Sequence, residues 1–382
     1  MNIRIKQRIG LVLLVTTLVA LLPGSLALDA AAARSAYAFT TIDFPGASKT
    51  IVMGNNARGD IIGYYTADNQ THGFLLEQGV LTTLDYPGTD ATSTQANAIN
   101  DAGDIVGVYS LKSGPQGNVH GFLRTKDGHW STVDYPEGTH LMQGGGYAID
   151  ANGTIFGCYH DGSPIAVMHG YRLGPEGASS FDHPAEAPFA MHYGVTPDGG
   201  TVVGSYVAGK NQPENWHGYV LSGGATISFD VPGQLGTNAL GAGRSPEVTI
   251  VGTYKVQVDS AWRQHGYVAA TNGSSDPAKW QFSMVDVPDA AQTIVRGVNA
   301  SGDLVGTYID ASGGTHGFTT RPGPGTSDGT GTSPGPAPAP PNTGTGQASE
   351  SGGAPLGVTA GVIGLALAAL TISGLLRRGA SR

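Results

Sequence analysis

Short apolar runs, separated by turns rich in Gly, Asp and Asn, recur along the chain from residue 39 to residue 321. In one copy the runs "TQANAIN", "DIVGVYS", "HGFLRT" and "HWSTVDYP" are each typical of a β-strand, and "NDAGD" and "KDG" are typical turns. The second run of a copy is apolar on both faces, as expected for a sheet packed between two other sheets. The pattern therefore predicts units of four antiparallel strands.

Three signatures recur in phase, six times each, with the histidines 48 to 51 residues apart. His-Gly followed by Phe or Tyr begins at His72, His120, His169, His217, His265 and His316. Gly-x-Tyr ends at Tyr65, Tyr109, Tyr159, Tyr206, Tyr254 and Tyr308. Asp-x-Pro begins at Asp43, Asp85, Asp134, Asp182, Asp230 and Asp286. A period of this length with four strands per unit indicates the blades of a β-propeller.

The two ends of the repeated region predict the number of blades. The first run, "FTTIDFP" at residues 39–45, matches the fourth strand of a unit, whereas the last run, "HGFTTR", matches the third strand. We therefore expect an all-β, six-bladed propeller spanning 39–321, in which the N-terminal strand completes the last blade and covers two exposed edges. The alternative is an open solenoid, which leaves the first strand unpaired.

The amino-acid composition favours strands over helices, and the N-terminal residues differ from the repeats. The chain has 60 Gly, 23 Pro and 13% charged residues, which favours strands and turns over helices. Residues 1–38 place basic residues before an apolar run and a small-residue stretch, as in a secretory signal peptide, with cleavage after Ala27 or Ala38. An uncleaved N-terminal anchor is the alternative.

The C-terminal region predicts attachment to the cell envelope. Residues 322–354 are mostly Gly, Pro, Ser and Thr and predict a flexible stalk. Residues 355–376 predict a transmembrane helix, and the basic tail at 377–382 predicts that the repeats lie outside the cell. The segment "PPNTG" resembles a sortase sorting signal, with Pro340 where that signal has Leu, which implies cleavage between Thr343 and Gly344 and attachment to the cell wall.

The segments "INDAGDIVGVY" and "HGFLRTKDGHWSTVDYP" resemble the HAF-repeat family of predicted bacterial extracellular proteins. In all six copies the middle residue of the family's His-Ala-Phe-like tripeptide is Gly rather than Ala. The resemblance covers residues 39 to 320. It implies secretion and a repeated architecture, and it implies no activity or catalytic residues.

A residue that recurs in every unit is expected to have a structural role that is common to all units. We therefore expect the six histidines to form hydrogen bonds between strands or blades, with a ring of metal ligands as the alternative. The six tyrosines are expected to pack between blades with bonded hydroxyl groups. The six aspartates are expected to accept backbone N–H groups in the turn that Pro begins.

Variable connections predict where a ligand binds. The segments between the recurring Tyr and His contain 6, 10, 9, 10, 10 and 7 residues, and they share one face with the connections between units. On this face the candidate ligand-binding residues, for a sugar or a protein, are Trp216, Trp262, Lys210, Glu214 and Arg263. The alternative is that each Trp covers its own blade.

A second candidate site is a group of His and Met residues in the connections around the third unit. Imidazole and thioether ligands together suit copper, although Met also fills gaps in cores. The group comprises His140, Met142, His160, Met168, His183, Met191 and His192. No other cofactor is predicted.

Charge and missing motifs narrow the function. The net charge is −9 for the whole chain, and this sign disfavours nucleic acid as a partner. Cys158 is the only cysteine, so no disulfide can form within the chain. The repeats contain no Gly-x-Ser-x-Gly elbow, and His-Glu-x-x-His and phosphate-loop motifs are absent from the chain. We expect a monomeric propeller that binds an extracellular glycan or protein at the cell surface. The alternatives are an extracellular lyase or hydrolase, a copper oxidase, or an envelope component without a ligand.

Overall fold

The computed structural model describes residues 37–112, 118–138, 144–163, 167–184, 187, 189–244 and 247–322. These residues form 24 β-strands and two short 3₁₀ turns, η1 (Pro213–Asn215) and η2 (Pro277–Lys279). In this part of the chain no helix is long and apolar enough to span a membrane. The predicted signal peptide up to residue 36, the stalk beyond residue 322, the helix at 355–376, the basic tail, and Thr343 and Gly344 lie outside the described residues.

The strands form six antiparallel groups of four, which we number blades 1 to 6. Blades 1 and 2 comprise β2 (Lys49–Asn55), β3 (Ile61–Ala67), β4 (Gln70–Glu77), β5 (Val80–Leu84), β6 (Ala91–Ile99), β7 (Ile105–Leu111), β8 (Val119–Arg124) and β9 (Trp130–Thr132). Blades 3 and 4 comprise β10 (Gly145–Ile149), β11 (Ile155–His160), β12 (Met168–Gly174), β13 (Gly177–Phe181), β14 (Ala190–Val195), β15 (Thr201–Val207), β16 (Trp216–Ser222) and β17 (Ala225–Phe229). Blades 5 and 6 comprise β18 (Leu235–Arg244), β19 (Val248–Val258), β20 (Ala261–Ala270), β21 (Gln281–Val285), β22 (Gln292–Val298), β23 (Leu304–Ile309), β24 (Thr315–Pro322) and β1 (Tyr37–Ile42).

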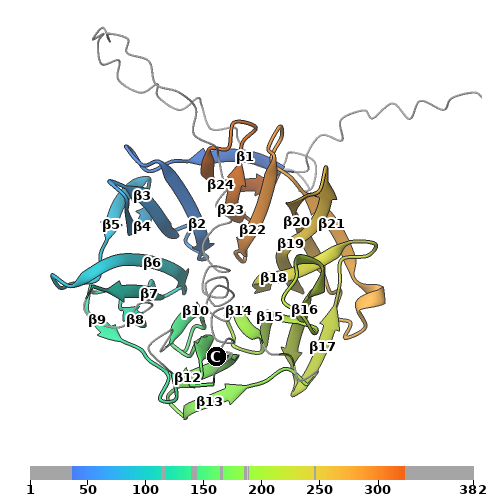
Figure 1. Ribbon diagram of the computed structural model, residues 1–382, viewed down its shortest axis with the longest axis horizontal. Coiled ribbons are helices and arrows are strands. Elements are labelled where there is room, and N and C mark those ends of the chain that lie inside the picture. Colours follow the sequence, from blue (N-terminus) through green and yellow to red (C-terminus); the bar gives the residue numbers. More distant parts are fainter. Residues whose placement is uncertain are drawn as a thin grey trace, which may run out of the picture. The chain divides into compact units, whose positions relative to one another are not determined.

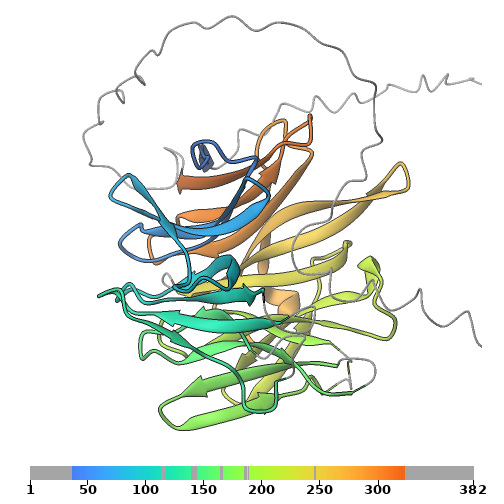
Figure 2. The ribbon, with the colours of Figure 1, turned by 60° about the vertical axis from the view of Figure 1, so that its left-hand side comes forward.

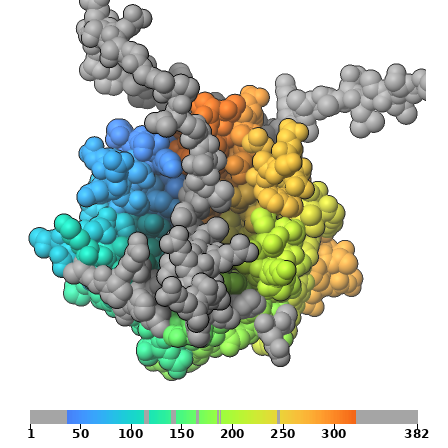
Figure 3. All heavy atoms as spheres, viewed as in Figure 1, coloured from blue at the N-terminus to red at the C-terminus, as the bar shows by residue number. Residues whose placement is uncertain are grey.

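The six blades follow one another around a centre, as in a propeller (Figures 1 and 3). Each blade packs against the next one, through β3 and β6, β7 and β10, β11 and β14, β15 and β18, and β19 and β22. Blade 6 packs against blade 1 through β23 and β2. The first strand of each blade lies nearest to the centre (Figure 1). Single bridges, Lys49 with Thr315 and Thr71 with Ser93, join blades 6, 1 and 2 into one hydrogen-bonded sheet.

The N-terminal strand completes blade 6. Strand β1 pairs antiparallel with β24, from Tyr37 opposite Pro322 to Ile42 opposite Gly317. The hydroxyl groups of Thr41 and Tyr308 lie 3.0 Å apart and add a bond across this junction. The strand pairing predicted from the two ends of the repeats is therefore confirmed. The strand begins at Tyr37, two residues before the predicted boundary at residue 39.

The glycine of Gly-x-Tyr is required because the second strand of each blade lies very close to the first. A Cβ atom on Gly63 or Gly107 would lie 2.0 Å from a backbone oxygen of the first strand, and one on Gly157 would lie 1.7 Å from such an oxygen. Gly204, Gly252 and Gly306 have the same restriction. Any larger residue at these positions would push the two strands apart.

The hydrophobic core lies between neighbouring blades. Between blades 4 and 5, for example, Val203 and Phe229 pack with Ile250 and Tyr267. Every residue of β15 is buried, as predicted for a sheet covered on both faces. Burial of each such large apolar side chain stabilises the fold by about 1.5–3 kcal/mol.

Candidate functional site

The six repeated histidines bind the six repeated aspartates on one face of the ring, which we call the loop face. This face carries the connections between the second and third strands and those between blades. Nδ1 of each His lies 2.5 to 3.1 Å from a carboxylate oxygen of the Asp that follows the fourth strand. The predicted hydrogen bond between strands is thus present in every blade. The last of these bonds joins His316 to Asp43, across the junction between β24 and β1.

Four of the six repeated tyrosines stack on an aromatic ring of the preceding blade. Tyr65 stacks on His72 of its own blade, with ring centroids 5.2 Å apart. Its other neighbour is Phe44, which follows the Asp43 of blade 6, at 3.7 Å. The Tyr65 hydroxyl lies 2.8 Å from Oγ1 of Thr83. Three further blade junctions repeat this stacking, through Tyr86 on Tyr109, Tyr135 on Tyr159, and His183 on Tyr206.

The role predicted for the aspartates was wrong. Their carboxylates bind histidine, and the backbone N–H after Asp43 instead donates to Oγ1 of Thr50, at 2.9 Å. The N–H groups of Tyr86, Val231 and Val287 donate in the same way to a threonine of the next blade. The threonine is available because the first strand of the next blade begins only a few residues after the aspartate. This strand places the threonine hydroxyl within hydrogen-bond distance of the N–H group in the turn.

The candidate ligand-binding residues lie at the junction of blades 4 and 5. Trp216 donates its Nε1–H to Oδ1 of Asn211, at 3.2 Å, and its ring lies 5.9 Å from Nζ of Lys255 in β19. The Lys255 ammonium donates to the carbonyl of Pro213, at 3.4 Å. Burial lowers the pKa of Lys255 to about 8, and the Glu214 carboxylate opposes this shift. The structure therefore brings Trp216 and Glu214 together around Lys255, which the sequence did not single out.

Trp262 and Arg263 lie on a different element, the long hairpin of β19 and β20 (Figure 2). The ten residues from 255 to 264 were expected to form a loop, but both strands continue, and only Asp259 and Ser260 form the turn. Both residues have positive φ, of 48° and 66°, as in a tight two-residue hairpin turn. Within the described residues the Trp262 side chain forms no ring stacking or hydrogen bond. Lys210 is exposed, and its carbonyl accepts a hydrogen bond from Nδ2 of Asn215.

Two histidines of the His and Met group, His183 and His192, contact aromatic rings and hydroxyl groups. His183 stacks on Tyr206 at 3.6 Å, with its Nε2 3.2 Å from Oγ of Ser228. Nδ1 of His192 lies 2.6 Å from the Tyr219 hydroxyl, and burial lowers the pKa of this histidine to about 3.

Met168 and Met191 pack in an apolar cluster with Cys158, and His160 is buried opposite Met168 in the β11–β12 pair. His140 and Met142 lie outside the described residues. No three His, Cys, Asp or Glu residues in the described ranges are arranged to hold a metal ion.

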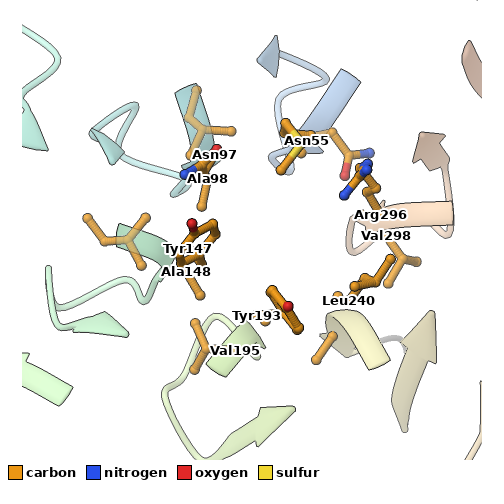
Figure 4. A pocket seen from close by; sticks show the side chains of 18 residues that line it. Asn55, Asn97, Ala98, Tyr147, Ala148, Tyr193, Val195, Leu240, Arg296 and Val298 are labelled. Carbon is orange, nitrogen blue, oxygen red and sulfur yellow. The ribbon is translucent and has the colours of Figure 1, made fainter. Parts of the chain in front are cut away.

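A central cavity of about 90 Å³ is lined by the first strands of all six blades (Figure 4). Each of these strands contains a β-bulge at the same place, which adds one residue and turns its side chain out of the regular pattern. The six bulged residues all line the cavity. They are Met53, Asn97, Tyr147, Tyr193, Leu240 and Arg296.

These six residues vary from blade to blade, with Tyr alone used twice, whereas the residue that follows each of them is always Gly or Ala. The small residues let the strands approach the axis, and the bulged residues give the cavity its chemical character. The sequence predicted a ligand site on the face that carries the variable connections, and this ring of residues was not predicted. The sequence signal is weak, because the first strands also vary two residues before the bulged position, where Ile51, Gln95 and Gly145 stand in blades 1 to 3.

Arg296 is the only charged residue among those that line the cavity. Its guanidinium is surrounded by protein, and this burial lowers its pKa, an effect opposed by the nearby Tyr64 and Tyr193. Among the described residues its Nε has no hydrogen-bond partner. Tyr193 donates its hydroxyl hydrogen to Sδ of Met191, at 3.0 Å.

No family model matches the chain, and none of the curated proteins does. Solved structures match the chain at low similarity. A gluconolactonase from Xanthomonas campestris is 13% identical, with a TM-score of 0.44, over 75% of this chain and 89% of that one. A mutant of AofleA from Arthrobotrys oligospora is 12% identical, with a TM-score of 0.44, over 75% and 87%. An ulvan lyase of polysaccharide lyase family PL25 is 13% identical, with a TM-score of 0.36, over 71% and 82%.

Proposed function

We propose that the protein is a binding module, displayed on the outer face of the cell envelope, that recognises an extracellular glycan or protein through the loop face of blades 4 and 5. We call this surface the blade 4–5 surface and define it by Trp216, Leu235, Lys255, Val258, Trp262 and Arg263. The observation that carries the proposal is the hairpin of β19 and β20, whose strands have 11 and 10 residues. Its ten paired positions, from Thr249 with Ala270 to Val258 with Ala261, are the most of any strand pair among the described residues, and within them Trp262 has no stacking or hydrogen-bond partner.

Exposed apolar side chains support this location. Leu235, which is 52% exposed, lies opposite Lys255 in the β18–β19 pair, and Val258, which is 38% exposed, lies next to the turn of the hairpin. Exposed apolar groups beside Trp and Arg are typical of the central residues of a binding surface. The cationic Lys255 and Arg263 on this surface favour a partner that carries negative charge.

Display on the cell surface is also a proposal. It is supported by the signal-peptide pattern, the stalk, the apolar span with its basic tail, and the resemblance to the HAF-repeat family and to a sortase signal. Cleavage after Ala27 would leave β1 intact, whereas cleavage after Ala38 would remove its first two residues. We therefore expect the mature chain to begin at Leu28, which N-terminal sequencing of the secreted protein would test.

Binding is tested with the purified full-length protein on arrays of extracellular glycans and on envelope proteins. We expect Trp262→Ala to weaken binding of the identified partner about tenfold or more, as is typical of a central interface residue, without lowering the melting temperature. The matched control is Val80→Ala, which removes an exposed apolar side chain (63% exposed) from the opposite face. Equal binding by the wild type and the Trp262→Ala variant would refute the proposed surface.

A further inference from the structure

We propose that the central cavity is a binding site for a carboxylate group, with Arg296 as its anchor. The cavity lies on the axis, away from the blade 4–5 surface, so the inference does not depend on which polymer the loop face binds. It rests on the position of Arg296, on the absence of a counter-ion around it among the described residues, and on the neutral groups that surround it.

The position of Arg296 is built into the strand. The register of β22 against β23 shifts between Val295 and Gly297, so the bulge directs Arg296 toward the axis rather than into the sheet. Figure 4 shows its side chain at the wall of the cavity, opposite the side that carries Tyr147. The residue is half-buried, so part of its side chain remains accessible. A guanidinium held in this way presents a planar set of N–H donors, which matches the two oxygens of a carboxylate.

The charge of Arg296 has no counter-ion in the described part of the protein. No Asp or Glu is among the residues that line the cavity, and no carboxylate of the described residues forms an ion pair with Arg296. The neighbouring phenols do not supply the charge either. Burial raises the pKa of Tyr147 and of Tyr193, so both remain neutral at physiological pH. An enclosed cation without a partner is costly, and an anion bound beside it offsets that cost.

The remaining wall suits a small organic acid. Met53 and Leu240 are apolar, and the two tyrosines offer flat ring surfaces. The cavity of about 90 Å³ exceeds the space that one water molecule needs several times over. A free carboxylic acid of the size of acetate fits this volume, and the carboxylate group of a sugar acid offers the same two oxygens to Arg296.

The test measures the melting temperature of the purified full-length protein during titration with sodium acetate at constant ionic strength, with chloride as the balancing anion. Acetamide, which has the same shape without the charge, is the matched probe. We expect acetate to raise the melting temperature of the wild type by several degrees in a saturable manner, and acetamide to have no effect. An equal response to the two probes, or no saturable response to acetate, would overturn the proposal.

Variants locate the site. We expect Arg296→Met to abolish the response to acetate and to raise the melting temperature without ligand, because the uncompensated charge is removed. Arg296→Lys should retain a response with at least about tenfold weaker affinity, because a lysine cannot form two parallel hydrogen bonds. The control is Arg172→Met, which removes an exposed arginine of β12 that does not line the cavity and should respond like the wild type. Retention of the full response in Arg296→Met would overturn the assignment to Arg296.

A second pair of probes identifies the source of the carboxylate. Sodium D-glucuronate is compared with neutral D-glucose under the same conditions. Binding of glucuronate at least tenfold tighter than acetate would indicate a sugar acid, and binding of acetate alone would indicate a small free acid. Both results support the carboxylate site, and both require Arg296.

Discussion

Neighbouring blades pack against each other through different residues at two junctions, the one between blades 1 and 2 and the one between blades 4 and 5. At the first junction Tyr86 stacks on Tyr109, with ring centroids 3.7 Å apart. On the opposite face Nδ2 of Asn56 donates to the carbonyl of Asn100, at 3.1 Å. At the second junction Val231 stands where Tyr86 would be, and Thr196 stands where an Asn would be.

Besides the repeated bond from the Val231 N–H to Thr237, the second junction has side-chain contacts that do not recur at the other described junctions. Among the described residues Tyr254 stacks only on His265 of its own blade, at 5.5 Å. Lys255 crosses the junction to the ring of Trp216 and to the carbonyl of Pro213. The comparison shows that two blades can pack together without the repeated aromatic stack. At the junction of blades 4 and 5, where that stack is absent, the polar side chain of Lys255 connects the blades.

The largest expected effect is the loss of unfolding free energy when Tyr109 or Tyr254 is replaced by Ala. We expect Tyr109→Ala to lower the free energy of unfolding by about 4 kcal/mol, because a buried ring, its stack on Tyr86 and its bond to Thr132 are lost. Tyr254→Ala should cost about 1 kcal/mol less, because it has no stacking partner across the junction among the described residues. Urea denaturation of the full-length variants measures both values, with Tyr109→Phe and Tyr254→Phe as controls. Equal costs for the two Ala variants would contradict the comparison.

A smaller effect is expected in the pH dependence of stability, which should differ between the two junctions because only the second contains Lys255. Burial lowers the pKa of Lys255 to about 8 in the folded state, from its ordinary value of 10.5. The unfolded chain therefore binds this proton more tightly, so the folded state is penalised below pH 8, and the penalty disappears as the pH rises toward 10.5.

We expect the stability of the wild type to increase relative to Lys255→Met between about pH 8 and pH 10.5, by about 2 kcal/mol. Denaturant titrations across this range measure the difference. Ser110 occupies the equivalent position in blade 2, and Ser110→Ala should show no such dependence. A flat difference between the wild type and Lys255→Met would exclude a buried lysine at this junction.

The smallest effect is expected at the His316–Asp43 pair of blade 6, beside the junction with blade 1, where Phe44 stacks on Tyr65 as Tyr86 does on Tyr109. Burial alone would lower the pKa of His316, but the Asp43 and Asp310 carboxylates together raise it above its ordinary value. A raised pKa stabilises the fold below about pH 6.5, and this contribution is lost as the pH rises through the folded value.

Asp43→Asn should therefore lower the melting temperature more at about pH 6 than at about pH 8, by less than about 1 kcal/mol in free energy, since the pair is partly exposed. Thermal unfolding at the two pH values measures this effect, and Asp289→Asn, which lies outside the pair, is the control. A larger loss at the higher pH than at the lower one would show that the histidine is not protonated in the pair.

The sequence predicted the strands well, because each strand is bounded by turn residues and the repeats confirm one another. The four runs of the second unit correspond to β6, β7, β8 and β9, and the orphan strand at the N-terminus pairs with β24. The bond between His120 and Asp134 could not be predicted from the sequence. Both residues recur at a similar spacing in nearly every unit, which indicates that each blade needs them. Recurrence does not show that the two side chains are in contact.

The candidate sites were harder to predict because they depend on local departures from regular strands. A bulge moves Arg296 to the axis, and a sequence pattern read with the regular period of a strand gives no warning of it. Lys255 was missed because the segment around it was expected to be a loop, whereas it continues β19. Trp216 and Glu214 were identified because their residue types are conspicuous on a variable connection.

The pairing of β1 with β24 has a consequence for how the chain reaches this structure. The bond between Asp43 and His316 joins residues 273 positions apart, so β1 is made first during synthesis and acquires its partner last. Until then β1 and the third strand of blade 6 both present unpaired edges, which are exposed to pairing with other chains. A lengthened delay in producing the final blade should therefore favour exchange of β1 between molecules. Domain-swapped oligomers would then be the expected by-product of slow maturation.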